Sequence, residues 1–399
     1  MLISHRIALD PNDRQATYFT RACGTARFAY NWALGEWQRQ YKEGGKPSEA
    51  ALRRQLNDIK GAQFPWMLEV TKNAPQQAIK NLGAAFKRFF AGKGKYPRFK
   101  KKGIADSFRA DNGPDKNHPH AVEVTGRRVK LPVIGWVRMR EPLRFNGKIQ
   151  SAVVSRTADR WFVSLTVEID HATPVRENQA AGGVDLGVSS LATLSDGSAV
   201  DGPKALCSNL ARLKRLSRSL SRKVKGSANR RKAKAKIARL HTRIGNIRAD
   251  ALHKLTTGLV GRFTVIGIED LNVRGMMAND RLARSIADMG FHEFRRQLAY
   301  KAAMYGSRVV VADRWHPSSK TCSECGAVLE ALPLSVREWD CPDCGTHHNR
   351  DVNAAKNLMK LAVSSTVTAC GEEGACLGFA AKVKPTSVKQ ESNIEATYA

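Results

Sequence analysis

Two Cys-x-x-Cys pairs constrain this chain more than any other feature. Cys322 and Cys325 form the first pair, and Cys341 and Cys344 form the second after fifteen intervening residues. A glycine follows each pair and permits the tight turn that brings two sulfurs to one ion. Four thiolates at this spacing predict a closed, tetrahedral, structural Zn²⁺ site, with His347 and His348 outside the ligand set.

The remaining cysteines do not form a disulfide framework. Cys23 and Cys207 stand alone, and Cys370 and Cys376 lie near the end of the chain. This distribution is typical of a reducing cytoplasm. The first residues lead into no apolar signal segment, and no run of about 18 apolar residues predicts a membrane span.

The charge of the chain indicates a polyanionic partner. Its 399 residues, enough for two or three domains, include 66 Lys and Arg against 36 Asp and Glu, a formal net charge of +30. Such an excess repels itself unless a polyanion lies against it, which favours nucleic acid. Composition alone leaves a generally basic surface as the alternative.

Apolar spacings of three and four predict three helices, over residues 14–41, 48–60 and 75–90. A basic loop follows, in which aromatic residues alternate with cations: Lys87, Arg88, Lys93, Lys95, Arg98, Lys100, Lys101 and Lys102. Cations bind phosphates and aromatic faces stack on bases, so the loop predicts nucleic-acid binding. The alternative is a solvated loop whose aromatics pack into a core.

Short alternating segments between residues 120 and 170 predict strands of a small β-barrel or antiparallel sheet, paired with an N-terminal strand at residues 3–9. A polar linker, residues 171–180, follows.

Residues 204–248 hold sixteen Lys and Arg and no acid. Two apolar stripes separated by Gly226-Ser227 predict an antiparallel helical hairpin. A face without counter-charges favours phosphate binding over a solvated helix pair. The candidate contacts are Arg222, Lys223, Arg230, Arg231, Lys232 and Lys234.

Three acids lie where charge is costly or catalytically useful. Asp185 interrupts an apolar strand, Glu269 ends another, and Asp351 begins the last predicted helix, near residues 353–361. Taken singly, each is more typical of a helix cap or an ion pair. Together, in so basic a chain, they favour an RNase H-like nuclease whose converging carboxylates hold two Mg²⁺ ions.

A helix over residues 283–304 and a strand over 309–313 are also predicted.

Six motifs match one known family: Gly183–Gly187, Ile268–Met276, Ser318–Gly326, Cys341–Gly345 with Arg350–Ala355, Arg27–Leu34, and Pro97–Lys102. In these motifs the chain resembles TnpB, the accessory protein of bacterial insertion sequences and a relative of type V CRISPR nucleases. Asn349 departs from the acidic residue common in the family before the Arg-Asp pair.

The resemblance implies an α+β multidomain protein. Its parts would be a wedge-like β-barrel (1–10 and 119–180), a helical recognition lobe (11–118), a RuvC-like nuclease domain of RNase H fold (181–320 and 347–364), an inserted zinc ribbon (321–346) and a disordered tail (365–399). Asp185, Glu269 and Asp351 would bind catalytic Mg²⁺, or Mn²⁺ in its place.

It also implies an RNA-guided endonuclease that is associated with transposition and recombination. A guide RNA from the transposon end would direct cutting of double-stranded DNA beside a short motif, in the bacterial cytosol. We expect a monomer. The alternatives are an RNA-guided DNA-binding regulator that has lost cleavage, which would need a broken triad, and a transposase that moves DNA itself.

Overall fold

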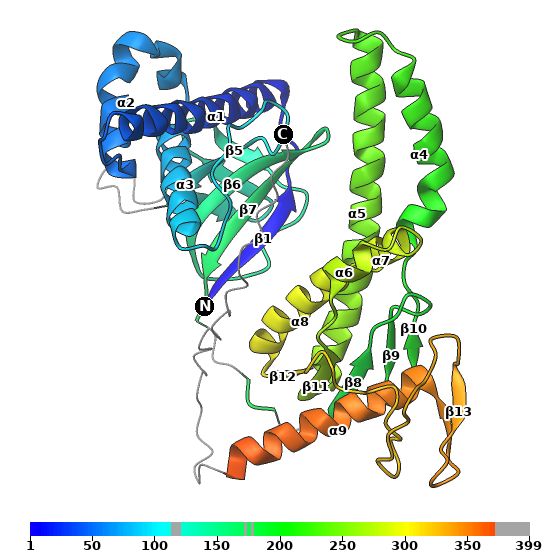
Figure 1. The fold of residues 1–399 in the computed structure, drawn as a ribbon. Helices are drawn as coiled ribbons and strands as arrows, with labels where there is room; N and C mark the ends of the chain where they lie inside the picture. The colour runs from blue at the N-terminus through cyan, green and yellow to red at the C-terminus, as the bar shows by residue number, and fades with distance from the viewer. Residues whose placement is uncertain (113–120, 171–173, 177–178, 372–399) are drawn as a thin grey trace. The chain divides into compact units, whose positions relative to one another are not determined.

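The computed structural model describes residues 1–112, 121–170, 174–176 and 179–371. Its contacts divide the chain into two compact units, residues 1–173 with 204–250, and residues 174–203 with 251–399 (Figure 1). The basic hairpin therefore groups with the first unit, although the predicted domain division placed it in the nuclease domain. None of the helices in the described part of the chain has the length and apolarity needed to cross a membrane.

Helices of the first unit begin and end within three residues of their predicted bounds. They are α1 (Asp13–Lys42), α2 (Glu49–Gln63) and α3 (Asn73–Phe90), with a 3-10 helix, η1 (Pro65–Glu69), between the last two. Asn12 and Gln15 form a reciprocal capping box that starts α1. The buried stripe of α1, which includes Phe19, Ala26 and Leu34, packs on α3 and the neighbouring sheet.

Two antiparallel sheets complete the core of this unit. The first has the order β1-β7-β6-β2 and the second the order β3-β4-β5. Their bounds are β1 (Leu2–Ala8), β2 (Ser107–Asp111), β3 (Glu123–Thr125), β4 (Arg128–Leu131), β5 (Gly135–Arg138), β6 (Lys148–Thr157) and β7 (Arg160–Glu168).

The first sheet confirms the expected pairing of the N-terminal strand, since Leu2 lies opposite Glu168 and Ala8 opposite Phe162. The predicted helical lobe, residues 11–118, also contains a strand that was not predicted: β2 pairs with β6 along its whole length. Residues 113–120 and 171–173, also covered by the predicted domains, lie outside the described residues.

The basic hairpin is formed by α4 (Ala205–Ser221) and α5 (Ala228–Arg262), with Gly226 in a left-handed turn at φ 86°. Leu213 and Leu216 of α4 pack against Leu240 and Ile244 of α5, which confirms the two predicted stripes. The helix α5 continues past residue 248, so its last turns belong to the second unit.

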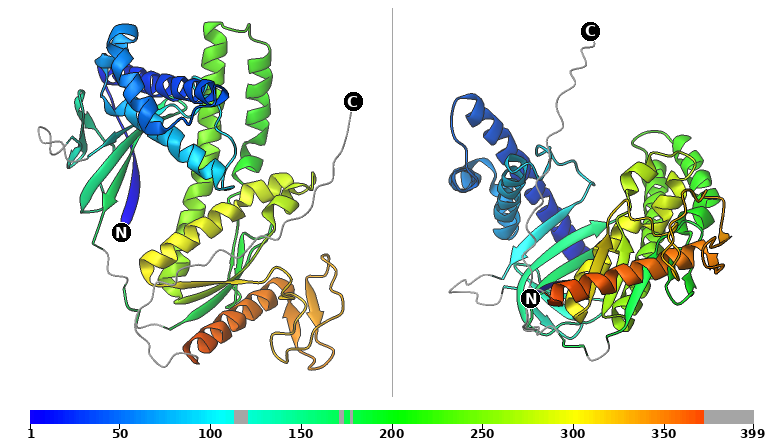
Figure 2. Two further views of the ribbon diagram at one scale, coloured as in Figure 1. Left: turned by 60° about the vertical axis from the view of Figure 1, so that its left-hand side comes forward. Right: turned by 60° about the horizontal axis from the view of Figure 1, so that its bottom comes forward.

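The second unit is built on a five-stranded sheet with the order β10-β9-β8-β11-β12. The bounds are β8 (Ala181–Asp185), β9 (Ala192–Leu194), β10 (Ala199–Val200), β11 (Val265–Glu269) and β12 (Arg308–Ala312). The strands β8, β11 and β12 run parallel, while β9 and β10 form antiparallel hairpins. Apolar side chains of these strands form a core with the end of α5 and with α7 and α8 (Figure 2).

Three helices lie between β11 and β12: α6 (Val273–Met277), α7 (Ala283–Met289) and α8 (Phe291–Tyr305). The predicted continuous helix over 283–304 was wrong, because Gly290 adopts φ 74° and ends α7. Only a residue that tolerates the left-handed region fits this break.

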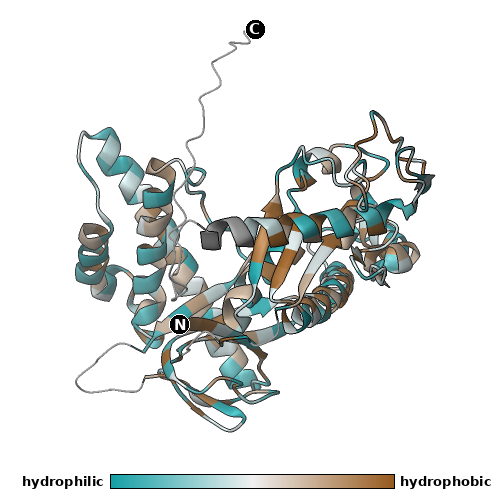
Figure 3. Cartoon of the chain, turned by 90° about the horizontal axis from the view of Figure 1, so that it is seen from below, coloured by the Kyte–Doolittle hydropathy of each residue, from teal (hydrophilic) through white to brown (hydrophobic). Residues whose placement is uncertain are grey.

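The last helix, α9 (Arg350–Gly371), lies across the other face of the sheet, beside the apolar strands (Figure 3). Paired glycines make room for it. A Cβ on Gly183 would lie 1.8 Å from the carbonyl oxygen of Ala355, and one on Gly267 would lie 2.1 Å from that of Leu358. The helix continues to Gly371, so the predicted tail begins too early at 365; residues 372–399 lie outside the described part.

Candidate metal centres

Strand alternation places two of the predicted acids on the α9 face of the sheet. Gly183 and Gly267 lie opposite each other in the parallel ladder and both face α9. Side chains two residues apart on a strand share a face. Asp185 and Glu269 are therefore on that same face, at the carboxyl ends of β8 and β11.

The third acid comes from the start of α9. The side chain of Asn349 accepts hydrogen bonds from the backbone amides of Asp351 and Val352, both at 3.2 Å. Asn349, which departs from the family pattern, therefore caps the helix as an acid would. Asp351 lies in the first helical turn, where the helix dipole favours negative charge.

The three carboxylates influence one another. Burial raises the pKa of Asp185 to about 8, and the negative charges of Glu269 and Asp351 add to this effect. Arg350 and Arg337 act in the opposite direction. A buried carboxylate whose pKa is raised by two neighbouring carboxylates marks a place suited to a divalent cation, since oxygen donors are the ligands that Mg²⁺ prefers.

Two further side chains contact these acids, and the sequence pattern did not indicate either role. The Ser318 hydroxyl donates to Glu269 Oε1 at 2.5 Å. Arg337 Nη1 approaches Asp351 Oδ1 at 3.4 Å. Both residues come from loops that are distant in sequence from the acids they contact, so no local spacing signals them.

The four cysteines converge as predicted. Their Sγ atoms all lie within 4.8 Å of one another, and within the described ranges no other set of three or more potential ligands is gathered so closely. The ligand atoms of the three carboxylates therefore lie farther apart than those of the four thiolates. Gly326 and Gly345 adopt φ 84° and 69°, and each amide donates back to the first cysteine of its pair.

Neighbouring groups contact two of the cysteines, and one of these contacts favours the thiolate form. The Thr346 hydroxyl lies 3.2 Å from Cys344 Sγ, and hydrogen bonding from Thr346 lowers the pKa of Cys344 to about 6. His348 Nε2 lies 3.0 Å from Cys322 Sγ. The donor set fits Zn²⁺, and the short hairpin of β13 (Glu338–Asp340) and β14 (His347–Asn349) frames it.

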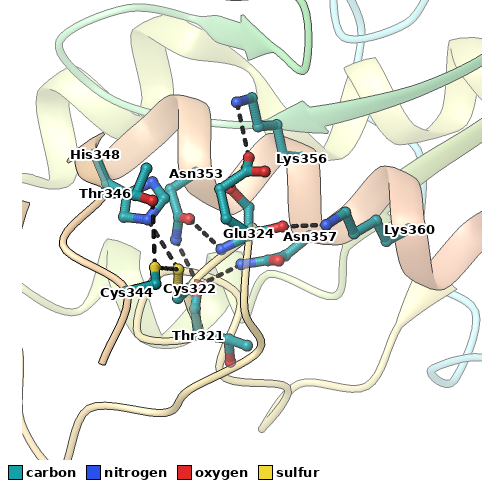
Figure 4. Close-up of polar contacts among 11 residues, drawn as sticks. Thr321, Cys322, Glu324, Cys344, Thr346, His348, Asn353, Lys356, Asn357 and Lys360 are labelled. Carbon is teal, nitrogen blue, oxygen red and sulfur yellow. Dashed lines mark hydrogen bonds and ion pairs between the residues drawn. The ribbon is translucent and has the colours of Figure 1, made fainter. Parts of the chain in front are cut away.

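Polar side chains on α9 fasten the cysteine segment to the sheet domain (Figure 4). Asn353 accepts from the Ser323 amide at 2.8 Å and donates to the Thr321 carbonyl at 2.7 Å. Asn357 donates to the carbonyls of Ser318 and Thr321. The same helix thus carries Asp351 and holds the backbone around Cys322.

Because α9 joins the two sites, loss of zinc is expected to disturb the positions of the carboxylates as well. Replacing Cys341 with serine should remove the bound zinc, which we expect at one ion per chain by elemental analysis, and lower the Tm by about 5–10 °C. Protease should then cut within residues 321–346. Cys207→Ser on α4 makes the same chemical change outside the cluster and should alter neither value. Unchanged zinc content in Cys341→Ser would contradict the assignment.

The basic loop is exposed and anchored to α1. All eight of its candidate cations are exposed. Asn31 of α1 exchanges two hydrogen bonds with the Lys100 backbone, at 2.7 and 2.9 Å. The aromatics divide between the two predicted roles: Phe89 is half-buried and packs edge-to-face on Tyr96 at 5.3 Å, while Phe90, Tyr96 and Phe99 remain exposed.

The hairpin candidates also divide. Arg222, Arg231, Lys232 and Lys234 are exposed. Arg230 instead donates to the carbonyls of Leu220 and Lys223 at 3.0 and 2.9 Å, which fastens the end of α4. Lys223 is half-buried.

A third cationic feature was not expected from the sequence. Thr125, Arg127, Arg128 and Arg138 line an open hollow of about 540 Å³ on the β3-β4-β5 sheet. Arg128 and Arg138 lie directly opposite each other in the ladder. Like charges so placed repel each other, so an anion in the hollow would relieve them.

Comparison with known proteins identifies the family. A family model described as "Probable transposase", of the OrfB type of IS605, matches residues 164–280. A Cas12f1-like TNB domain model matches residues 291–358, and a helix-turn-helix domain model matches residues 1–46. The chain is 42% identical to a "Putative RNA-guided DNA endonuclease" of Streptomyces pristinaespiralis, over 96% of this chain and 94% of the relative. The chain belongs to the TnpB family.

A second relative and one solved structure agree with this membership. The chain is 35% identical to the "Putative RNA-guided DNA endonuclease InsQ" of Escherichia coli K12, over 93% of this chain and 94% of the relative. A Cas12f1–sgRNA–target DNA complex matches with a TM-score of 0.55 and 15% identity, covering 87% of this chain and 83% of that one. This TnpB chain therefore resembles the Cas12f1 chain in fold, which agrees with the broad fold class expected from the motifs.

Proposed function

We propose that this protein is an RNA-guided, divalent-metal-dependent DNA endonuclease that cuts double-stranded DNA beside a short motif. The observation that carries the proposal is the meeting of Asp185, Glu269 and Asp351 at one edge of the sheet, near enough that the other two carboxylates raise the pKa of Asp185. The relatives named as RNA-guided DNA endonucleases support the same activity.

In this proposal the second unit is a RuvC-like nuclease domain of RNase H fold. Its strand order, with an antiparallel hairpin at one side and parallel strands at the other, supports that assignment. The first unit would supply the wedge and recognition parts, and the cysteine segment the zinc ribbon. The guide RNA and the target DNA would be the partners, and the bacterial cytosol the place of action.

The three carboxylates would hold Mg²⁺, with Mn²⁺ as a substitute. When bound, the metal supplies Lewis acidity that activates water and stabilises the leaving oxygen of the phosphodiester. The neighbouring residues of the chain would hold the three carboxylates in position. Asn349 fixes the start of α9, the Ser318 hydroxyl orients Glu269, and the glycines of β8 and β11 allow the helix to approach the strands.

Arg337 would exchange partners during the reaction. Its contact with Asp351, at 3.4 Å, is long for an ion pair and half-exposed. The Arg337 guanidinium would leave Asp351 when that carboxylate serves as a metal ligand, and would then be available to the negative charge of a phosphodiester.

The cationic surfaces would hold nucleic acid through its backbone, while base pairing with the guide reads the sequence. Candidate contacts are the basic loop, the exposed hairpin cations and the arginine hollow of Arg127, Arg128 and Arg138. This division of labour accounts for the net charge of +30.

Salt dependence tests the hairpin. Replacing Arg222, Arg231, Lys232 and Lys234 with glutamine should flatten the slope of log K against log salt by about 0.9 for each duplex phosphate that is no longer neutralised. The measurement is binding of a 20-base-pair RNA–DNA duplex between 50 and 300 mM NaCl by the Asp185→Ala protein.

The matched control removes charge from ion-paired arginines: Arg21, Arg39 and Arg296 contact Glu69, Glu43 and Glu293 at 2.7–2.8 Å. Their glutamine variants should leave the slope nearly unchanged. An equal slope in both sets of variants would mean that the hairpin is a solvated surface and does not bind phosphates.

The function itself is tested with protein purified together with its native RNA. Cleavage of a plasmid library with randomised flanks, in Mg²⁺, is expected to give cuts beside one enriched motif. Binding without cleavage in Mg²⁺ would instead favour the silent regulator, and excision of an element by this protein alone would favour a transposase.

A further inference from the structure

Trp315 is the most exposed of the seven tryptophans, with 85% of its surface open to solvent. It follows β12 in the loop Asp313-Arg314-Trp315-His316. An indole left in water forgoes the stabilisation that burying its apolar surface would contribute. A single exposed apolar residue is ordinary, so its setting decides whether it has a role.

Hydrogen bonds of the backbone shape the loop around Trp315 into a turn. Its amide donates to Asp313 Oδ1 at 2.9 Å, and the His316 amide donates to the Asp313 carbonyl at 3.0 Å. The Ser318 amide donates to the His316 carbonyl at 2.8 Å. The backbone therefore presents the indole from a fixed turn, with its side chain free of the core.

Contacts on both sides of Trp315 reach the carboxylate edge. The preceding residue, Arg314, donates to Asp270 at 2.9 Å, and Ser318 donates to Glu269 at 2.5 Å. In the ladder, Glu269 also lies opposite Ala312, the last residue of β12. Three residues span at most about 11 Å, so the backbone of Trp315 lies within that distance of Ala312, the residue opposite Glu269.

We propose that Trp315 is a substrate-positioning residue that stacks on an unpaired DNA base next to the phosphodiester held by the carboxylates. The inference rests on the proposed function. An indole face binds any base by stacking, and an unpaired base offers that face, whereas the faces of a base inside a duplex are covered by the neighbouring base pairs. Trp315 would thus select a single-stranded segment and fix its register on Asp185, Glu269 and Asp351.

The test uses the full-length Asp185→Ala protein purified with its RNA, so that binding is measured without cutting. The probe is a fluorescein-labelled 16-nucleotide single-stranded DNA in Mg²⁺. Trp315→Ala is expected to weaken binding about tenfold, and Trp315→Phe to stay within about threefold of the parent. Tyr41→Ala, which removes an exposed aromatic of α1, should have no effect.

A spectroscopic signal separates stacking from a structural role. With 2-aminopurine placed along the same strand, its fluorescence should be quenched at one position by the parent and not by Trp315→Ala. With Asp185 intact, Trp315→Ala should raise KM more than it lowers kcat.

Equal affinity and equal quenching in the parent and Trp315→Ala would overturn this inference while leaving the nuclease intact. Failure of the Asp185-intact protein to cleave any DNA would instead overturn the proposed function.

Discussion

Asp185→Ala is expected to lower the rate of DNA cleavage by at least about a thousandfold without releasing the nucleic acid. In the proposed site this carboxylate would share bound metal with Glu269 and Asp351, whose charges raise its pKa. Metal Lewis acidity contributes several kcal/mol to such reactions, and each 1.36 kcal/mol changes the rate about tenfold. Single-turnover cleavage with saturating enzyme measures the effect on chemistry directly.

The same residue should also make the stability of the folded protein depend on pH. Its pKa is about 8 in the folded protein, against about 3.9 in an unfolded chain. Between these values the folded state keeps a proton that the unfolded state has lost, so Asp185 disfavours folding progressively as pH rises through this window. In metal-free buffer, Asp185→Asn should therefore have a higher Tm than wild type at pH 9, and a smaller advantage at pH 5.

Mg²⁺ should raise the Tm of wild type at pH 9 and have little effect on Asp185→Asn. A variant that loses cleavage and also loses stability at pH 9 would mean that the aspartate is structural. Asp270→Asn is the matched control, because Asp270 adjoins Glu269 but pairs with Arg314 at 2.9 Å. It should keep most of the cleavage rate.

Gly183→Ala is expected to destabilise the protein by about 3 kcal/mol or more, which corresponds to a Tm roughly 6–12 °C lower. The new Cβ would lie 1.8 Å from the Ala355 carbonyl oxygen, a backbone atom that moves only with α9. Displacing α9 moves Asp351 away from the strand acids. Cleavage should then fall more than tenfold at temperatures where the protein is still folded.

Gly258→Ala is the control for this substitution. Gly258 lies within α5, and a Cβ there meets nothing within 4 Å. The replacement should stabilise by about 0.5–1 kcal/mol, because alanine is the better helix former. Equal Tm and equal cleavage in Gly183→Ala and wild type would contradict the close packing of α9 on β8.

Local sequence patterns predicted most of the helices and strands, but few of the contacts between them. The periodicity of α1 and the alternation of β6 and β7 are strong signals because one face of each is buried. The strand β2 is five residues long and follows the basic loop, so only its pairing with β6 identifies it. The break at Gly290 depends on its φ of 74°, which an apolar periodicity does not encode.

The candidate site shows the same division. Cysteine spacing predicted the cluster, because four thiolates in two knuckles admit few other arrangements. The carboxylates were found by their cost in apolar surroundings and by family motifs. The sequence did not indicate the roles of Arg337, Ser318 and Asn357. The partners of all three are distant in sequence, and Asn357 lies on a helix, where a polar residue ordinarily faces solvent.

Retargeting tests the central claim most directly. The protein is purified with its native RNA and, separately, with RNA whose guide segment is replaced by an unrelated sequence; each complex then receives a plasmid carrying both matching targets beside the native motif. We predict that cleavage moves to the target that matches the new guide, requires Mg²⁺, and disappears in Asp185→Ala. Cuts that stay at the native target, or that persist equally in Asp185→Ala, would contradict RNA-guided cleavage by these carboxylates.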